Sequence, residues 1–317
     1  NGSNDPSTLH WHGLHIPGDV DGGPHQEIAP GNTWSPDVPI TQHASMNWFH
    51  SHQHGRTASQ VYKGLAGVML IEDDASLSAD LPKTYGVDDF TIVLQDKAFT
   101  DAGVLDYSLT AASLEDGFLG DTLVVNGAIA PVSQSVPTGL VRLRILNACN
   151  GNFLTLSMAS GPLNVIASDG GFLSATVQTD TIVMSPGERY EILVDMQQIA
   201  SNQLMVAYSL AESGGIGGFF RDLISGGESE VAALTLNRRS EPGFDGAMPD
   251  QLANIAPPDR SAATVTRSFE LQMDTGADLD AIAFASGDMC GDLSAMHING
   301  QPMSMDRIDE TVRKSAT

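Results

Sequence analysis

The sequence predicts an all-β protein made of Greek-key β-sandwiches in more than one copy. Its apolar runs are of strand length and are bounded by Gly, Pro, Asn and Asp, with 32 glycines and 16 prolines in 317 residues. Sustained helical periodicity is hard to find. Many short strands at regular spacing are typical of β-sandwiches, and a chain of this length has room for two or three domains.

Nine segments carry the strand signal. In "LVRLRIL" the apolar residues Val141, Leu143 and Ile145 alternate with Arg142 and Arg144, which predicts a half-buried strand. The predicted strands are Asn47–Ser51, Gly67–Glu72, Phe90–Leu94, Leu140–Leu146, Leu163–Ala167, Thr181–Met184, Tyr190–Asp195, Leu204–Tyr208 and Phe269–Met273.

Polar stretches divide these strands into groups. The first group ends near Asp74, and "DDASLSADLPKTYGVDD" is interpreted as a linker into a second sandwich from about Phe90 to about Asn237. A stretch rich in Pro, Asp and Ala, "RRSEPGFDGAMPDQLANIAPPDRSAAT", is interpreted as a long connector. The predicted domains are residues 1–76 (a first sandwich without its opening strands), 77–240 (a second sandwich) and 241–317 (the connector and the start of a third).

The charge balance excludes two classes of partner. With 15 basic and 39 acidic residues the net charge is −24, which argues against nucleic acid and against an anionic membrane surface. Cations would be attracted, although a need for solubility explains the same charge. The longest apolar stretches are strand-length, so no membrane span is predicted.

Two cysteines, Cys149 and Cys290, make no disulfide framework, and a single bridge between them stays open. The chain opens on "NGSNDPSTLHWHG", a turn leading into a strand, and no export signal is visible. We expect the natural start to lie upstream.

Eight of the nine histidines lie between His10 and His54, five of them in "HWH" and "HSHQH". Alternate residues of a strand share a face, so His10 and His12 are predicted to lie together with Trp11 opposite, and His50, His52 and His54 likewise. Packed imidazoles without a metal would leave buried nitrogens unsatisfied, at about 1–3 kcal/mol each. The pattern therefore predicts a metal site.

Copper and zinc both suit imidazole ligands, and the spacing alone does not choose between them. The helical zinc-protease motif H-E-x-x-H is absent, and no thiolate lies near the pairs. Trp11 and Trp48 are assigned to packing. Arg56 and Lys63 are assigned equally to the surface or to the surroundings of the site.

Several motifs together resemble the multicopper oxidases, in particular the bacterial copper-efflux oxidase and laccase-like branch. They are "STLHWHGLHIPGDVDGGP", "NWFHSHQHGRTASQVYKGLAGVMLIEDD", "GDTLVVNGAIAP", "VRLRILNACN" and "VIASDGGFL", and the likeness runs to about Asp195. The resemblance implies tandem cupredoxin-like Greek-key β-sandwiches, two of them largely complete here and a third only begun. It also implies a blue type 1 copper and a trinuclear type 2/type 3 copper cluster.

The resemblance assigns ligands residue by residue. It implies that His10 binds the type 2 copper, that His12 binds a type 3 copper, and that His50 and His52 bind the type 3 pair. Asp21, in "DVDGG", matches the acidic residue that the family uses as a proton relay, and a turn-forming Asp before Gly-Gly is an equally good explanation. His54 belongs to the motif without being a ligand.

The chain departs from the family pattern in its ligand count. The family has four H-x-H pairs, of which this chain carries two, and its blue copper needs a Cys, two His and usually a Met. Cys149 is interpreted as a buried small hydrophobe, and Cys290, His297 and Met303 as an improbable substitute. His297 is interpreted as a loop or strand-edge residue that introduces the third domain.

We therefore expect a chain truncated at both ends, whose blue copper lies in a missing C-terminal part. That part would be a further segment of the third domain or a second chain. A natural, truncated copper-binding protein without turnover is the remaining explanation.

The predicted function is that of a copper-dependent oxidoreductase, inactive as this chain alone. It would oxidise phenolic or aromatic substrates or cuprous ions and reduce dioxygen to water, in the periplasm or outside the cell, as the family implies. The alternatives are a non-catalytic copper-binding repeat protein or scaffold and, third, a two-domain copper nitrite reductase. The late methionines are assigned to packing: Met273, Met289, Met296, Met303 and Met305.

Overall fold

The computed structural model describes residues 1–109, 113, 117–208, 229–256, 259–273, 296–302, 304, 306 and 307. Strands dominate these residues and the helices are short, so the predicted all-β class is confirmed. Each predicted strand is present, with bounds that differ by a few residues.

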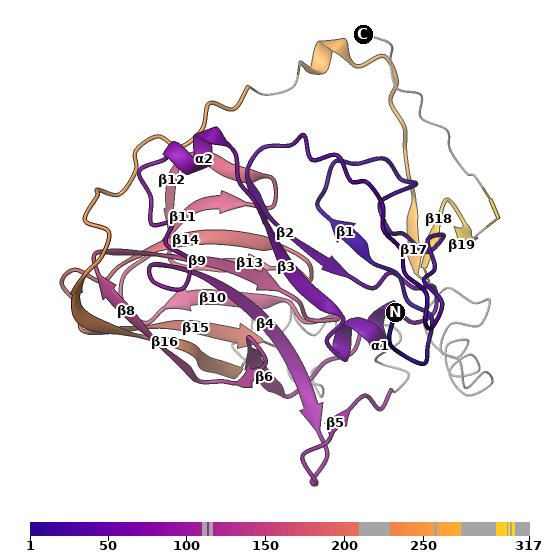
Figure 1. The fold of residues 1–317 in the computed structure, drawn as a ribbon, viewed down its shortest axis with the longest axis horizontal. Coiled ribbons are helices and arrows are strands. Elements are labelled where there is room, and N and C mark those ends of the chain that lie inside the picture. Colours follow the sequence, from indigo (N-terminus) through magenta and orange to yellow (C-terminus); the bar gives the residue numbers. More distant parts are fainter. Residues whose placement is uncertain are drawn as a thin grey trace.

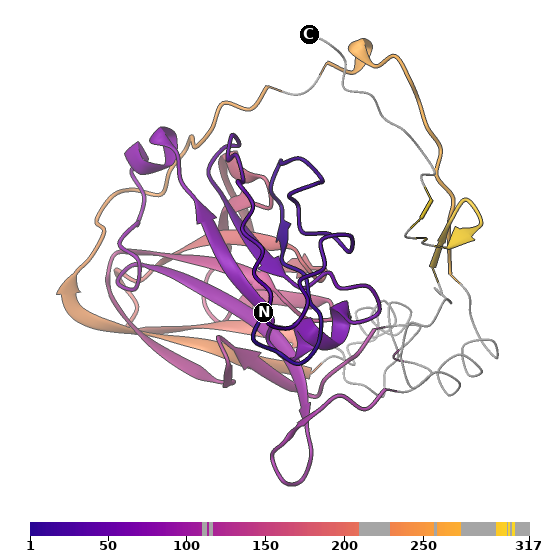
Figure 2. The ribbon, with the colours of Figure 1, turned by 45° about the vertical axis from the view of Figure 1, so that its right-hand side comes forward.

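The first region forms a three-stranded antiparallel sheet in the order β1-β2-β3. Its strands are β1 (His10–His12), β2 (Ser45–His50) and β3 (Ala66–Ile71), with the helix α1 (Thr57–Tyr62) between the last two. Figure 1 and Figure 2 show this sheet lying against one face of a larger sheet.

The second region, residues 89–242, is a sandwich of two sheets. The larger has the order β12-β11-β14-β9-β4-β6-β7, with β5 paired to β4, and the smaller has the order β13-β10-β15-β16-β8. The larger sheet comprises β4 (Asp89–Phe99), β5 (Leu105–Asp106), β6 (Thr122–Val125), β7 (Ala128–Ile129), β9 (Leu140–Asn147), β11 (Leu163–Ser168), β12 (Gly171–Thr179) and β14 (Arg189–Asp195). The smaller comprises β8 (Val132–Thr138), β10 (Leu154–Met158), β13 (Ile182–Met184), β15 (Ser201–Tyr208) and β16 (Ser229–Pro242).

The main hydrophobic core lies between these two sheets. Val141, Leu143 and Ile145 project into it from β9 and meet Leu156 and Leu204 of the smaller sheet. Burial of such side chains stabilises the fold by about 1.5–3 kcal/mol each.

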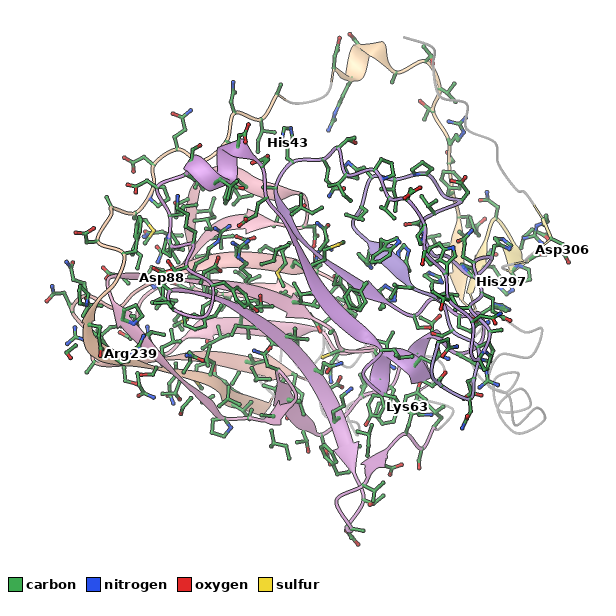
Figure 3. All side chains as sticks on the ribbon, in the orientation of Figure 1. His43, Lys63, Asp88, Arg239, His297 and Asp306 are labelled. Carbon is green, nitrogen blue, oxygen red and sulfur yellow. The ribbon has the colours of Figure 1, made fainter. Side chains whose placement is uncertain are left out.

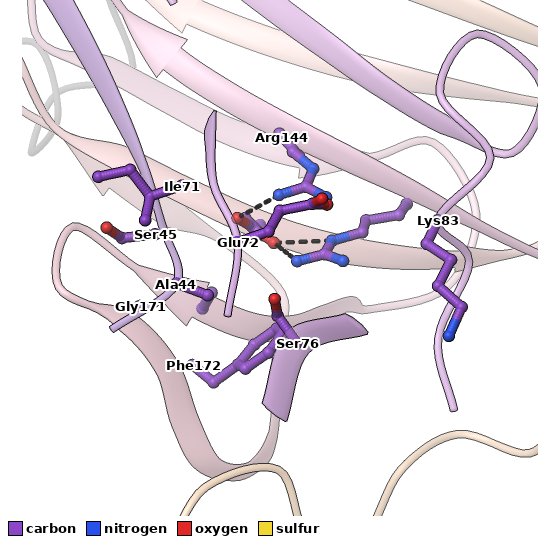
Figure 4. Close-up of a pocket in the computed structure, with 12 residues that line it drawn as sticks. Ala44, Ser45, Ile71, Glu72, Ser76, Lys83, Arg144, Gly171 and Phe172 are labelled. Atoms are coloured by element: carbon purple, nitrogen blue, oxygen red, sulfur yellow. Dashed lines mark hydrogen bonds and ion pairs between the residues drawn. The ribbon is translucent and has the colours of Figure 1, made fainter. Parts of the chain in front are cut away.

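The prediction that β9 is half-buried is wrong. Arg142 and Arg144 are each 4% exposed because the first region covers the face of the sheet that carries them. Arg144 donates from Nε and Nη2 to Asp89, and both arginines bind the Glu191 carboxylate. Figure 4 shows this pairing in a pocket that Ser45 and Glu72 of the first region also line. Buried charges persist where such partners compensate them.

The stretch predicted to be a linker is partly ordered against the sandwich. It contains the helix α2 (Asp74–Ser78), whose N-terminus is closed by a capping box between Asp73 and Ser76. Leu81, three residues beyond that helix, is buried in a small apolar cluster with Leu140 and other residues of the sandwich. The chain therefore runs from the first sheet to β4 in contact with the second region.

After β16 the predicted connector first packs on the sandwich and then leaves it. Leu252 donates its amide to Ser174 of β12, and the chain continues through a short 3-10 helix (Arg260–Ala262). A small antiparallel sheet follows, formed by β17 (Leu271–Met273), β18 (Met296–Ile298) and β19 (Gln301–Pro302). His297 lies on its middle strand, so its assignment to a loop or strand edge is wrong. Cys290, Met289, Met303 and Met305 lie outside the described residues.

Candidate metal centre

The pairing of β1 with β2 gathers the imidazoles on one face. His10 pairs with His50 and His12 with Trp48 across the two strands. The ring centroid of His10 lies 5.8 Å from that of His12 and 5.2 Å from those of His50 and His52. His10 and His12 therefore share one face, as predicted, while Trp11 packs against Phe49 on the other side.

Ring nitrogens of three of the histidines lie close together. One ring nitrogen each of His10, His12 and His50 lie within 4.8 Å of one another, and Nδ1 of His12 is 3.2 Å from Nε2 of His50. Two imidazole nitrogens at this separation need a proton or a metal between them, because two lone pairs repel. The geometry can hold a metal ion.

His52 reaches the cluster from a loop, because β2 ends at His50. The prediction that His50, His52 and His54 share a strand face is therefore wrong. The His52 amide donates to Oγ1 of Thr8, at 2.6 Å, and this bond turns the loop back towards β1. The His52 ring stands 6.1 Å from that of His50, whereas His54 lies in the following turn and is exposed.

Backbone carbonyls fix the orientation of two of the rings. Nδ1 of His10 lies 3.0 Å from the Asp21 carbonyl, and Nδ1 of His50 lies 2.7 Å from the Ser51 carbonyl. An Nδ1–H that donates to a carbonyl leaves the Nε2 lone pair free for a metal. Both Nε2 atoms are therefore available as ligands.

Asp21 lies beside His10, where the sequence predicted an acidic group. Its Oδ1 is 3.4 Å from Nδ1 of His10, and its carbonyl also accepts the Trp11 amide. Gly22 has φ +76°, and a Cβ there would lie 1.8 Å from the Leu9 carbonyl oxygen, so a glycine is required for this loop to approach β1.

The pKa values favour neutral rings. Burial, and after it the nearby Arg189 charge, lower the pKa of His12 to about 4. Burial also lowers the pKa of His50 to about 4, and that of His52 is lowered mainly by its loss of water contacts. Metal ligation requires neutral imidazole, so these rings need not lose a proton at pH 7. The donor set fits copper or zinc.

Trp48 does more than pack in a core. Its ring centroid lies 4.2 Å from that of His50 and 5.1 Å from that of His12, so it covers both imidazoles. Arg56 pairs with Asp5, and Lys63 is exposed at the end of α1, as Figure 3 shows. Thr8, Ser51 and Trp48 were not predicted as parts of the site, because no motif marks a backbone carbonyl or a stacked ring.

Cys149 is buried in the core of the sandwich, as predicted. Burial raises the pKa of its thiol well above the usual value, and the neighbouring Asp96 carboxyl raises it further. Among the described residues, Cys149 belongs to no group of three side chains that could hold a metal ion. Cys149 therefore does not supply a blue copper site.

The fold and the paired histidines define the class of protein. Residues 1–76 and residues 88–219 match two sequence profiles, each described as multicopper oxidase. This chain belongs to the multicopper oxidase family.

Its relatives include enzymes and a cell division protein. The chain is 38% identical over 304 residues to cell division protein FtsP of Escherichia coli (strain K12), covering 95% of this chain and 59% of that protein. It is 36% identical to CueO, a bacterial laccase-like multicopper oxidase from the lignin-degrading Ochrobactrum sp., with a TM-score of 0.81 over 98% of this chain and 66% of that one. The multicopper oxidase McoA from Aquifex aeolicus is 32% identical, with a TM-score of 0.74 over 86% of this chain and 59% of that one.

The chain thus spans 59% of the length of FtsP. Within the described residues, no helix combines the length and the apolar character needed to cross a membrane.

Proposed function

We propose that this chain is part of a copper-dependent oxidoreductase that reduces dioxygen to water. In this proposal His10, His12, His50 and His52 supply one half of a trinuclear copper cluster. The other half and the blue copper ligands come from a further domain or a second chain. The chain alone would bind copper without turnover.

One observation carries the proposal. Nitrogens of His10, His12 and His50 converge within 4.8 Å on a face where burial keeps His12 and His50 neutral. A structural histidine needs no such convergence. The multicopper oxidase profile over residues 1–76 contains the same residues, which supports copper over zinc.

The residues of this chain would divide the work as follows. Copper, when bound, would pass electrons singly, so that dioxygen takes up four electrons and four protons to give two waters. The Asp21 and Ser51 carbonyls hold the rings of His10 and His50, and Trp48 excludes water from one side of the site. The Asp21 carboxylate would hold and release a proton at Oδ1 beside the cluster.

A phenolic or aromatic reductant is the substrate we favour. The Ochrobactrum relative, 36% identical, is described as a laccase-like oxidase acting on lignin model compounds and lignosulfonate. Cuprous ion is the other candidate, and the net charge of −24 would attract it. We propose a periplasmic or extracellular location, because copper chemistry of this family takes place there.

Copper binding tests the proposal on the chain itself. The purified chain is dialysed against Cu²⁺, and the copper retained is compared among the wild type, His50→Ala and His43→Ala. His43 is a suitable control because its side chain is 97% exposed. We expect the wild type and His43→Ala to retain equal copper and His50→Ala to lose it. Equal retention by all three variants would overturn the proposal.

Turnover is tested on the natural polypeptide that contains this chain. Oxygen consumption with 2,6-dimethoxyphenol, and separately with Cu⁺, identifies the reductant. Absence of consumption with either, in a protein that holds copper, would overturn the oxidase function.

The second candidate is a non-catalytic copper-binding or scaffold protein. The 38% sequence identity to cell division protein FtsP, over 95% of this chain, favours this candidate. A copper-binding protein would retain copper without consuming oxygen, and a scaffold would do neither. The two experiments above distinguish these outcomes.

A further inference from the structure

One side of the histidine cluster is bordered by a segment that does not belong to the first sheet. The turn between β13 and β14, residues 185–188, belongs to the second region and lies against His12 and Trp48. None of the histidine motifs includes this turn.

Gly187 is the residue of closest approach. A Cβ at Gly187 would lie 3.3 Å from Cε1 of His12 and 3.7 Å from Cζ2 of Trp48. The backbone there has φ +88°, which also favours glycine. With His50 and Trp48 beside it and Gly187 near its Cε1 edge, the His12 ring has little freedom to turn.

Arg189 fixes the turn to the strand that carries the cluster. Its buried guanidinium donates from Nε to the Met46 carbonyl of β2, at 3.0 Å, and from Nη1 to the Gly187 carbonyl, at 3.0 Å. Nη1 also lies 2.8 Å from Oδ1 of Asp169, in the turn between β11 and β12. One side chain therefore joins β2 to two turns of the sandwich.

The same guanidinium borders the residue that follows His12. A Cβ on Gly13, which has φ +95°, would lie 2.8 Å from Nη2 of Arg189 and 2.3 Å from Oδ1 of Asn47. The backbone after His12 is thus confined between Arg189 and Asn47, while the ring is confined by Gly187.

We propose that Gly187 and Arg189 of the second region position His12 as a metal ligand. The inference rests on the proposed copper site, and it makes that site a product of two regions of the chain. Partners beyond the ligands commonly change metal affinity by about 10–100-fold when they are altered.

The main test compares two glycine substitutions. Gly187→Ala adds a methyl group against His12, whereas Gly127→Ala is a matched control, because Gly127 has φ +82° and open space around its Cβ position. Both glycines have a positive φ of similar size, so an alanine is disfavoured by the backbone at either position. We expect Gly187→Ala to weaken Cu²⁺ binding at least about tenfold in a chelator competition, and Gly127→Ala to leave it unchanged.

Two further measurements keep the inference testable if Gly187→Ala folds poorly. In the metal-free wild type, NMR is expected to show a cross-relaxation contact between the Gly187 Hα protons and the His12 Hε1 proton. Arg189→Met is expected to change the Cu²⁺ EPR spectrum, and Arg189→Lys to restore it in part, whereas Arg239→Met, at an exposed arginine, is expected to leave it unchanged.

The outcomes separate this inference from the proposed function. If the wild type retains no copper, the proposed function fails, while the NMR contact still tests the placement of Gly187. If the wild type binds copper and Gly187→Ala binds it as tightly as Gly127→Ala, the positioning role is overturned. An unchanged EPR spectrum in Arg189→Met would remove the arginine from the proposal.

Discussion

The three-stranded sheet that carries the histidines and the sandwich behind it are stabilised differently. The sandwich has a large apolar core between two sheets. The core of the first sheet is small, and it depends on Leu146, Ala148 and Val93 of the larger sheet. The sheet is otherwise held by polar contacts, such as those of Ser7, Ser51 and Gln60. The region that carries the chemistry therefore relies on the region that does not.

The largest expected effect is at the ionic network on the face of the larger sheet that the first region covers. Glu191→Gln removes the carboxylate shared by Arg142 and Arg144, leaving buried positive charge, and should lower the free energy of unfolding by about 3–5 kcal/mol. Glu241→Gln is the control, because that side chain is 63% exposed and its Oε2 lies 3.9 Å from Nε of the exposed Arg239. Denaturant unfolding measures both. Equal stability of the two variants would mean that the buried network does not stabilise the fold.

Next in size is a cavity in the sandwich core. Leu156→Ala should cost about 2–5 kcal/mol, whereas Leu77→Ala, on the exposed face of α2, should cost less than about 0.5 kcal/mol. Because the small core of the first sheet depends on the larger sheet, the fluorescence of the three tryptophans, Trp11, Trp34 and Trp48, should report the same midpoint as circular dichroism. Separate midpoints would show that the histidine sheet is stable independently.

Copper should stabilise the first region by a smaller amount. A ligand at 100 times its Kd adds about 2.7 kcal/mol to the free energy of unfolding. We expect this gain, measured as a rise in Tm on adding Cu²⁺, in the wild type and in His43→Ala. It should disappear in His12→Ala. A rise that persists in His12→Ala would place the copper elsewhere.

A further expected effect is the pH dependence of the metal-free chain. The pKa values of His12 and His50 are lowered from 6.5 to about 4 in the folded state, so the unfolded chain binds more protons between these values. Their contribution to stability is full above pH 6.5 and is lost as the pH falls towards 4. Denaturant midpoints measured from pH 7 to pH 4 should fall less steeply in His12→Phe/His50→Phe. Identical slopes would contradict the assigned shifts.

The sequence predicted the parts of the fold that depend on local patterns. Alternating apolar residues located β9 and β14, and the H-x-H spacing located the face that His10 and His12 share. It failed where a distant segment decides the outcome. Arg142 and Arg144 looked solvent-exposed because their partners, Asp89 and Glu191, lie some 50 residues away in sequence.

The candidate ligands of the site were predictable from the sequence, but the residues that orient these ligands were not. Spacing cannot show that β2 ends at His50, because the Thr8 hydroxyl turns His52 back towards β1 through a contact between distant residues. Gly187 and Arg189 were not predicted as parts of the site. A glycine that must admit a ring and a glycine that merely turns the chain look the same in one sequence.

The packing of Gly187 and Arg189 around His12 has a consequence for biosynthesis. Arg189 is added about 180 residues after His12, which takes roughly 10 to 35 s at the usual 5–20 residues per second of translation. During that interval the imidazoles exist without the backbone that confines them. The histidine site therefore cannot reach its final geometry until the turn before β14 has been made.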